Sequence, residues 1–207
     1  MVKLPVPPPA DQLRYQPEHL HHLDSESVLW RVHRTSGDHV VPWNQLRHWG
    51  PSPTMRFDPH EPPTRTQVRG VSYTALTVPT ALAEVFQQRR IINTRRGAPY
   101  LTAWAPACAL TLLDLTGIWP IQAGASHVIN TGRRDHCRAW ARTIHTAWPA
   151  LDGLWHHSSM TGGEAVTLFT HAGDSFPPRP MLSLPLDHPG LRAHLLDAAT
   201  ALGYRVV

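Results

Sequence analysis

At 207 residues the chain has the length of a single domain, and a hydrophobic content of 42% with eight tryptophans is enough for a sizeable core. Charged residues make up 16%, which argues against a disordered or purely electrostatic protein. The excess of 19 basic over 15 acidic residues is almost all arginine, since Lys3 is the only lysine. A guanidinium binds phosphate bidentately, so a small phosphate-bearing ligand explains these arginines as well as nucleic acid does.

Neither the first residues nor the cysteines point to secretion. The segment MVKLPVPPPA has prolines where a signal peptide needs an unbroken apolar core, and no stretch approaches the roughly 20 apolar residues of a membrane span. Cys108 and Cys137 are too few for a disulfide framework and are expected to be buried free thiols in a reducing compartment. We therefore expect a soluble, cytoplasmic protein that does not bind a membrane.

The chain is expected to form one domain, residues 28–207, preceded by an N-terminal proline-rich arm, residues 1–27. We predict a helix around residues 11–23 of the arm. The arm is expected to pack on the domain edge or to stay mobile. We find no internal repeat and no pattern that would support a second core.

The domain is predicted to open with a strand and a long connection. VLWRVH, residues 28–33, alternates as a strand does, with Trp30 and Val32 on one face and Arg31 on the other. Residues 34–67 are rich in proline and show little periodicity. Connections of this length are usually functional.

A strand and a helix are predicted next. Residues 70–75 read as a strand, and a helix begins near Thr77, which suits the N-cap, with Pro79 placed where its missing N–H costs nothing. Glu84 lies at the edge of the apolar stripe of this helix, not clearly opposite it. A half-buried carboxylate that faces a cleft would occupy such a position.

The rest of the chain predicts an α+β fold. Trp140, Ile144 and Trp148 repeat at helical spacing and form one apolar stripe. Strands and helices do not alternate as regular parallel units, so we expect a single domain with a mixed or antiparallel sheet and flanking helices. The remaining predicted elements are strands at residues 100–105 and 110–115, a strand in DGLWHHSS with EAVTLFTH as its antiparallel partner, a strand at 181–186, a helix at 189–202 and a closing strand in YRVV.

Four polar residues follow or interrupt apolar elements: Arg31, Tyr73, Glu84 and Ser158. Taken singly, each has an ordinary explanation as a surface or half-buried residue, because polar side chains mostly lie at the surface. Ser158 opens SSMTGG, a turn whose exposed backbone amides can hold a phosphate or a ribose hydroxyl. A plain hairpin is the more frequent meaning of such a turn.

The familiar signatures of metal and nucleotide sites are missing from the sequence. There is no HExxH, no CxxC and no Cys–His cluster, and His156 and His157 are adjacent on a predicted strand, so they point to opposite faces. GxGxxG, Walker and GxSxG motifs are also missing. We therefore expect no metal site and neither a Rossmann, a P-loop nor an α/β-hydrolase fold.

In this order, the segments resemble the RES domain family, which is named for its arginine, glutamate and serine. LWRVHR is similar to the family's opening strand, with Arg31 as its arginine, and RFD resembles its arginine–aromatic turn, here Arg56 and Phe57. RGVSYTALTVPTALAEVFQ resembles the family's strand ending in tyrosine and the helix that carries the glutamate. GLWHHSSMTGG followed by AVTLF resembles the serine segment. The family serine is Ser158 or Ser159, and we prefer Ser158.

The resemblance spans roughly residues 28–170 and implies an ADP-ribosyltransferase-like fold that acts on NAD without a metal. Members of the family are toxins of toxin–antitoxin pairs that deplete NAD by hydrolysis or phosphorolysis. Each is held inactive by an antitoxin with a helix-turn-helix, Xre-like domain. The first hypothesis is therefore an NAD glycohydrolase or phosphorylase that acts as a toxin.

The same resemblance implies a role for each site residue. Glu84 would hydrogen-bond the ribose and stabilise its developing positive charge, and Tyr73 would stack on nicotinamide. Arg31 would pair with the pyrophosphate, and Ser158 would hydrogen-bond a ribose or phosphate oxygen. The candidate catalytic residues are Glu84, Arg31 and Tyr73, and the candidates for contact with NAD are Arg31, Tyr73, Ser158, Arg56 and Phe57.

Two other hypotheses remain open. An ADP-ribosyltransferase would modify a protein or nucleotide, but the helix end VFQQRR offers no acid to orient such an acceptor, which favours water or phosphate. A non-catalytic module would bind nucleic acid or an acidic antitoxin through the arginines at 89, 90, 95 and 96. The aromatic residues of a nucleic-acid platform are missing there, so direct nucleic-acid binding is not expected. The acceptor, the cognate antitoxin and self-association into a homo-oligomer are left open by the sequence.

Overall fold

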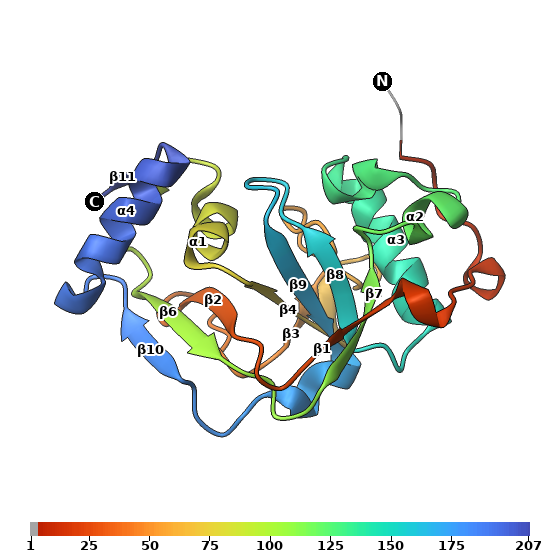
Figure 1. Cartoon of the computed structure of the whole chain (residues 1–207), viewed down its shortest axis with the longest axis horizontal. Coiled ribbons are helices and arrows are strands. Elements are labelled where there is room, and N and C mark those ends of the chain that lie inside the picture. The colour runs from red at the N-terminus through yellow and green to blue at the C-terminus, as the bar shows by residue number, and fades with distance from the viewer. Residues whose placement is uncertain (1–3) are drawn as a thin grey trace.

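The apolar strands assemble into one large sheet in a computed structural model that describes residues 4–207 (Figure 1). From edge to edge the strands are β1 (Leu20–Leu23), β7 (Leu110–Asp114), β8 (Gly153–His157), β9 (Glu164–Phe169), β4 (Arg65–Ala75), β2 (Leu29–Arg34), β6 (Pro99–Trp104) and β10 (Leu182–Pro185), with β3 (Arg47–Gly50) paired to β4. Within this sheet β7 and β8 run parallel, whereas the other neighbours are antiparallel. The predicted α+β class is confirmed.

One face of the sheet is covered by helices at its two ends (Figure 1). At one end α3 (Arg134–Ala147) packs the buried Trp140 and Ile144 against apolar residues of β7, β8 and β9. At the other end α1 (Val78–Phe86) and α4 (Arg192–Leu202) cover β2 and β6 in a second cluster. The middle of this face lies between the two clusters.

The opposite face is closed by a third apolar cluster. It joins Leu29 and Trp104 from the sheet to Trp43 of the long connection and to η4 (Thr170–Ser175). The shorter elements are η1 (Ala10–Gln12), η2 (Pro17–His19), α2 (Trp119–Gln122), η3 (His127–Asn130), η5 (Pro189–Leu191) and the parallel pair of β5 (Ile91–Ile92) with β11 (Arg205–Val206). Within residues 4–207 there is no helix both long and apolar enough to cross a bilayer.

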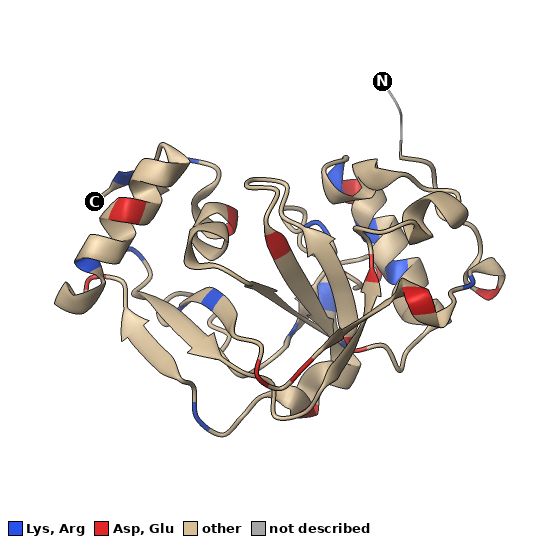
Figure 2. Cartoon of the chain, viewed as in Figure 1, with Lys and Arg blue, Asp and Glu red and all other residues tan. Residues whose placement is uncertain are grey.

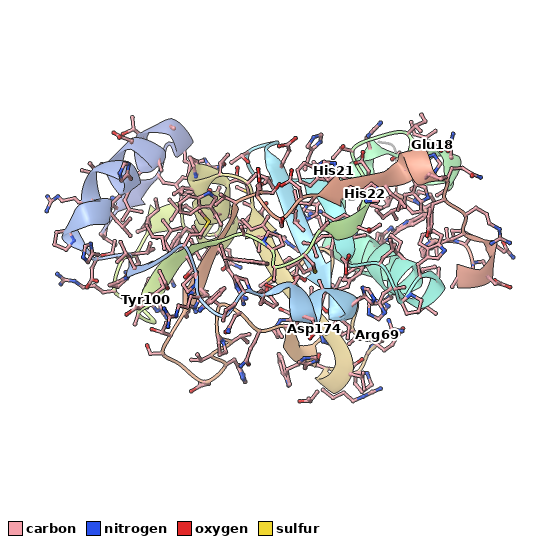
Figure 3. The ribbon with its side chains drawn as sticks, turned by 60° about the horizontal axis from the view of Figure 1, so that its bottom comes forward. Glu18, His21, His22, Arg69, Tyr100 and Asp174 are labelled. Carbon is pink, nitrogen blue, oxygen red and sulfur yellow. The ribbon has the colours of Figure 1, made fainter. Side chains whose placement is uncertain are left out.

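The helix predicted around residues 11–23 of the arm is wrong. Residues 1–3 of the arm lie outside the described part, and η1 and η2 are single turns separated by an extended segment. The next residues form β1, which pairs with β7, and Figure 3 shows His21 and His22 on this edge strand. The open edge of β7 offers backbone hydrogen bonds that outweigh a weak local preference for helix.

The arm is attached to the domain by two indole groups. Trp119 Nε1 donates to Arg14 O and Trp140 Nε1 donates to Pro5 O, each at 2.9 Å. Leu13 is only 3% exposed and belongs to the same apolar cluster as these tryptophans. The described part of the arm is therefore attached to the core through Leu13 and these two hydrogen bonds.

The helix predicted from Thr77 is confirmed in its details. Thr77 is the N-cap of α1, and its Oγ1 accepts a hydrogen bond from Thr80 N at 3.3 Å. Pro79 is within the first turn, where no intrahelical donor is needed. This cap fixes where α1 begins and therefore which face of the helix carries Glu84.

The prediction of two buried thiols is half wrong. Cys137 is buried on α3, but Cys108 is exposed. Cys108 lies in the short connection between β6 and β7, outside the alternating pattern of either strand, so nothing directs its side chain into the core.

The sheet opens between β2 and β4. These neighbours share a single residue pair, Trp30 with Ala75, whereas β4 and β9 pair over five residues. Beyond Trp30, strand β2 pairs with β6 on its other side and moves away from β4. This gap, between the helix clusters of the covered face, is where the cavity lies.

Candidate active site

A cavity of about 550 Å³ occupies the opening between β2 and β4 and extends beneath α1 and α3. Its volume lies in the range of small-molecule sites. Glu84 is the sole carboxylate among its lining residues, which are all within the described chain. The cationic residues that line it are Arg31, Arg34, Arg47, Arg56 and Arg134.

Glu84 is held by hydrogen bonds to both of its carboxylate oxygens. Ser158 Oγ donates to Oε1 at 2.5 Å, and Gln87 Nε2 lies 3.3 Å from Oε2 and 2.7 Å from the Glu84 carbonyl oxygen. Gln87 in turn accepts from Arg134 Nη2 at 2.7 Å. A chain of contacts from α3 to α1 therefore fixes the orientation of the acid.

Ser158 lies behind Glu84, and its hydroxyl is fully used there. In addition to donating to Glu84, it accepts hydrogen bonds from the backbone N–H groups of Met160 and Thr161, at 3.1 and 3.3 Å. Ser158 is 2% exposed, while its neighbour Ser159 lines the cavity. The sequence predicted contact of Ser158 with a ribose or phosphate oxygen. In the structure this hydroxyl instead donates to the Glu84 carboxylate.

Tyr73 lines the cavity from β4 with its hydroxyl buried. The oxygen has no hydrogen-bond partner within residues 4–207. Burial, reinforced by the nearby negative charge of Asp58, raises the pKa of Tyr73 well above its usual value. The phenol therefore keeps its proton and stays a donor at neutral pH.

Arg31 lines the cavity from β2, at the point where the sheet opens. Its Nη1 donates to the carbonyl oxygens of Trp43 and Gln45, at 2.8 and 3.2 Å. Burial, together with the positive charge of Arg47, lowers the pKa of Arg31 to about 10, so it is still charged at neutral pH. Carbonyl dipoles orient this guanidinium without neutralising it.

Arg56 and Phe57, although adjacent in sequence, lie in different environments. Arg56 lines the cavity, and its Nη1 donates to the Gly132 carbonyl and lies 3.5 Å from Cys137 Sγ. Phe57 is 1% exposed and packs in the cluster behind α3, with its ring centroid 4.6 Å from that of His156. Phe57 therefore forms the wall of the site.

Sequence reasoning missed a buried network behind Tyr73. Asp58 accepts from Arg47 Nη2 and from Ser52 N, each at 2.7 Å, and its other oxygen contacts His60 Nδ1. Burial opposes ionisation of Asp58, but the His60 hydrogen bond and the Arg47 charge outweigh it and hold the pKa of the carboxyl well below its usual range. A Cβ at Gly50 would lie 2.6 Å from the His60 ring, which explains the glycine at the end of β3.

The sequence also missed Gln87 and Arg134. Gln87 follows Glu84 at i+3, a spacing that brings side chains together on a helix, so this contact could have been found. Nothing in the sequence indicates that Arg134 of α3 would reach α1. The same is true of Arg47, which reaches the site because β3 pairs with β4, with Arg47 opposite Val71.

The two adjacent histidines of β8 differ in environment. His156 is buried, with Nε2 2.9 Å from Thr167 Oγ1, and burial lowers its pKa to about 4. His157 is exposed. No group of three or more His, Cys, Asp or Glu side chains that could hold a metal ion is found in the described residues.

Comparison with known proteins gives the family. The RES domain model matches residues 28–194. The chain belongs to the RES domain family. Among solved structures, this RES domain is similar to a chain of the crystal structure of the M. tuberculosis MbcT–MbcA toxin–antitoxin complex, with a TM-score of 0.53 and 16% identity over 84% of this chain and 91% of that chain. No curated protein matched the sequence.

Proposed function

We propose that this RES domain protein cleaves the bond between nicotinamide and ribose in NAD. The observation that carries the proposal is Glu84, held on both oxygens by Ser158 and Gln87. It is the one carboxylate among the described residues that line this arginine-lined cavity. A single oriented anion among cations suits a substrate that is itself anionic and develops positive charge at one carbon when it reacts.

In the proposed reaction Glu84 acts on the ribose. As the nicotinamide–ribose bond breaks, the bonding electrons leave with nicotinamide and the ribose carbon becomes oxocarbenium-like. A fixed carboxylate close to that ring stabilises the charge without having to reorient. Ser158 and Gln87 hold it in place, and neither needs to touch the substrate.

The arginines and Tyr73 serve binding. Arg31 and Arg56 both line the cavity, and guanidinium groups are suited to the two negative charges of the dinucleotide's diphosphate. The Tyr73 ring provides an aromatic wall that can pack against the nicotinamide and keep water from it.

The nature of the acceptor separates this proposal from ADP-ribosyl transfer. A transferase needs a second group to orient its acceptor, and no second carboxylate lines the cavity in the described chain. This favours a small acceptor, water or inorganic phosphate. ADP-ribosyl transfer remains the alternative.

We further propose that an antitoxin regulates the enzyme. Support comes from the fold shared with a chain of a toxin–antitoxin complex and from the exposed arginines at 89, 90, 95 and 96, which suit an acidic partner. Figure 2 shows acidic segments interspersed with basic ones over the helices and strands, whereas a nucleic-acid site usually gathers basic residues on one face. A non-catalytic nucleic-acid module is therefore the weaker alternative.

The test is to incubate the purified protein with NAD, with and without inorganic phosphate, and to measure nicotinamide and the ribose product. We expect nicotinamide release, and a fall of roughly 100-fold or more in Glu84→Gln. A requirement for phosphate identifies phosphorolysis, whereas release without phosphate identifies hydrolysis. No release under either condition, with the protein folded, contradicts the proposed cleavage.

A further inference from the structure

The turn that follows β8, residues 158–163, contacts α1 at two points. Ser158 Oγ donates to Glu84 Oε1 at 2.5 Å, and Thr161 Oγ1 lies 3.0 Å from Thr80 Oγ1. Thr80 and Glu84 are at positions i and i+4 of α1, so they lie on the same face of the helix. The turn therefore lies along one turn of α1, with the carboxylate of the cavity at one contact and a pair of hydroxyl groups at the other (Figure 1).

The backbone N–H groups of this turn are used within the turn. The sequence indicated that exposed amides there can hold a phosphate or a ribose hydroxyl, and the structure corrects this. Each hydrogen bond ends on an oxygen of the turn itself: Met160 N and Thr161 N on Ser158 Oγ, Gly162 N on the Ser158 carbonyl, Ser158 N on the Gly163 carbonyl and Gly163 N on Thr161 Oγ1. The turn therefore places side chains and does not offer these amides to a ligand.

A chain of hydroxyl groups connects the turn to the beginning of α1. Thr77, the N-cap, donates from Oγ1 to Thr80 Oγ1 at 2.9 Å. The proton of Thr80 is then free for Thr161, because a hydroxyl accepts and donates at the same time. Thr80 is 3% exposed, so water has little access to compete for this contact. The cap that begins the helix is thus linked to the turn that orients the acid of the helix.

Gly163 allows the two threonine hydroxyls to meet. A Cβ at this position would lie 2.8 Å from Thr80 Oγ1 and 3.2 Å from Thr161 Oγ1, so a larger residue would push these oxygens apart. Unlike its neighbour Gly162, which has a φ of 71°, Gly163 does not have a positive φ. The glycine at 163 is therefore required by the space between the threonines and not by its backbone conformation.

We propose that Thr80 and Thr161 are positioning residues, whose hydrogen bond holds the turn so that Ser158 can orient Glu84. Neither threonine is among the residues that line the cavity, so both act without touching the substrate. The expected effect on the rate rests on the proposed function. The coupling of Thr161 to Ser158 rests on the contacts alone, so it can be measured without NAD.

The first experiment measures amide hydrogen exchange by NMR in the protein without NAD. Thr161→Val removes the hydroxyl of an exposed residue, so the fold should be kept. The amides of Met160 and Gly162, which donate to Ser158, should exchange roughly tenfold faster in this variant. Thr116→Val is the matched control, because the Thr116 hydroxyl also closes a turn after a strand, β7, and is outside the cavity lining. It should leave these amides unchanged.

The second experiment measures nicotinamide release. Thr161→Val should lower kcat roughly 3- to 10-fold and change KM much less, because the acid is present but held less firmly. Thr161→Ser keeps the hydroxyl and should recover most of the rate. Because the effect passes through Ser158, Thr161→Val should cause little further loss in the Ser158→Ala background. A general structural defect would instead lower kcat by the same factor in both backgrounds.

A third variant opens the contact while keeping both hydroxyls. Gly163→Ala should speed exchange of the Met160 and Gly162 amides and lower kcat as Thr161→Val does, because its Cβ separates Thr80 from Thr161. Gly173→Ala is the matched control. The nearest atom to a Cβ at Gly173 is a Leu46 side-chain carbon at 3.9 Å, which is an ordinary contact, so neither quantity should change.

The outcomes separate this role from the proposed reaction. Unchanged amide exchange in both Thr161→Val and Gly163→Ala would show that the contact does not hold the turn, and the proposal would be wrong. Faster exchange with an unchanged kcat would contradict the positioning role, as would equal losses in the two backgrounds. Faster exchange in a protein that never cleaves NAD would support the coupling of Thr161 to Ser158 and contradict the proposed function.

Discussion

Glu84 depends on a neighbour that does not face the ligand. Ser158 is buried, and its hydroxyl joins the carboxylate to the turn that follows β8. A hydrogen bond to a charged group contributes more than one between neutral groups, because the charge polarises the donor. In the proposed reaction the serine therefore acts through the orientation of the acid.

Ser158→Ala should lower kcat for nicotinamide release by roughly tenfold and change KM much less, because Glu84 remains present but loses an oriented donor. Steady-state kinetics with NAD measures both constants. Ser158→Thr is the matched control, since it keeps the hydroxyl and should recover part of the rate. An unchanged kcat in the alanine variant would show that the hydrogen bond does not position the acid.

His156 should make the stability of the fold depend on pH. Its pKa is about 4 in the folded protein, lowered by burial from 6.5, so the unfolded chain binds more protons between these values. The unfolding free energy should therefore fall as the pH is lowered from about 6.5 to 4, by up to about 3 kcal/mol from this residue. Denaturant titration at several pH values measures it.

Two variants isolate the contribution of this residue. His156→Gln should remove part of the pH dependence, while substitution of the exposed His157 by Gln serves as the control for the same strand. Equal pH dependence in the wild type and in His156→Gln would contradict the assignment.

At this scale the sequence predicted the acid, the tyrosine and the arginine of β2 but not their partners. Gln87 could be placed from its helical spacing to Glu84. Arg47 could not be placed, because it reaches the cavity through the pairing of β3 with β4. The register of this pair shifts after Arg47, and β3 lies in a proline-rich segment that has no periodic pattern. Local spacing carries no information on such a contact.

At the scale of elements, a side-chain hydrogen bond joins α1 and α3 across the cavity. Arg134 Nη2 and Gln87 Oε1 are 2.7 Å apart, and Gln87 continues to Glu84. Arg134 is exposed, so water and salt screen this interaction and its effect should be modest.

Arg134→Ala should therefore lower kcat roughly two- to fivefold, and the loss should be smaller at high salt, where the wild type is already screened. Arg133→Ala is the matched control, because Arg133 is the adjacent exposed arginine and pairs with Asp135 outside the cavity. Equal losses in the two variants would indicate a general charge effect and contradict a specific link between the helices.

The elements predicted best were those with a local stop or start signal. Thr77 and Pro79 define the beginning of α1, and Gly203, in the left-handed conformation at φ 65°, ends α4 as expected. The arm was predicted wrongly because its structure depends on an edge strand and two indole groups far along the chain. The parallel pairing of β7 with β8 likewise has no local signal.

At the scale of the molecule, the arm should contribute to global stability. Leu13 is 3% exposed in the cluster behind α3, so Leu13→Ala should lower the unfolding free energy by about 2–4 kcal/mol. Val6 is 78% exposed, and Val6→Ala should change it by less than about 0.5 kcal/mol. Urea denaturation followed by tryptophan fluorescence compares them. A loss below about 1 kcal/mol in Leu13→Ala would show that the arm is not part of the cooperative unit.

The single residue pair between β2 and β4 has a mechanical consequence. Elsewhere the sheet is tied by ladders of several backbone hydrogen bonds, but at this seam only Trp30 and Ala75 are paired. The two halves of the sheet can therefore change their spacing by bending about one point, without breaking a ladder. The width of the cavity can therefore change easily. It is set by the side chains that bridge β2 and β4 and by whatever ligand fills the cavity.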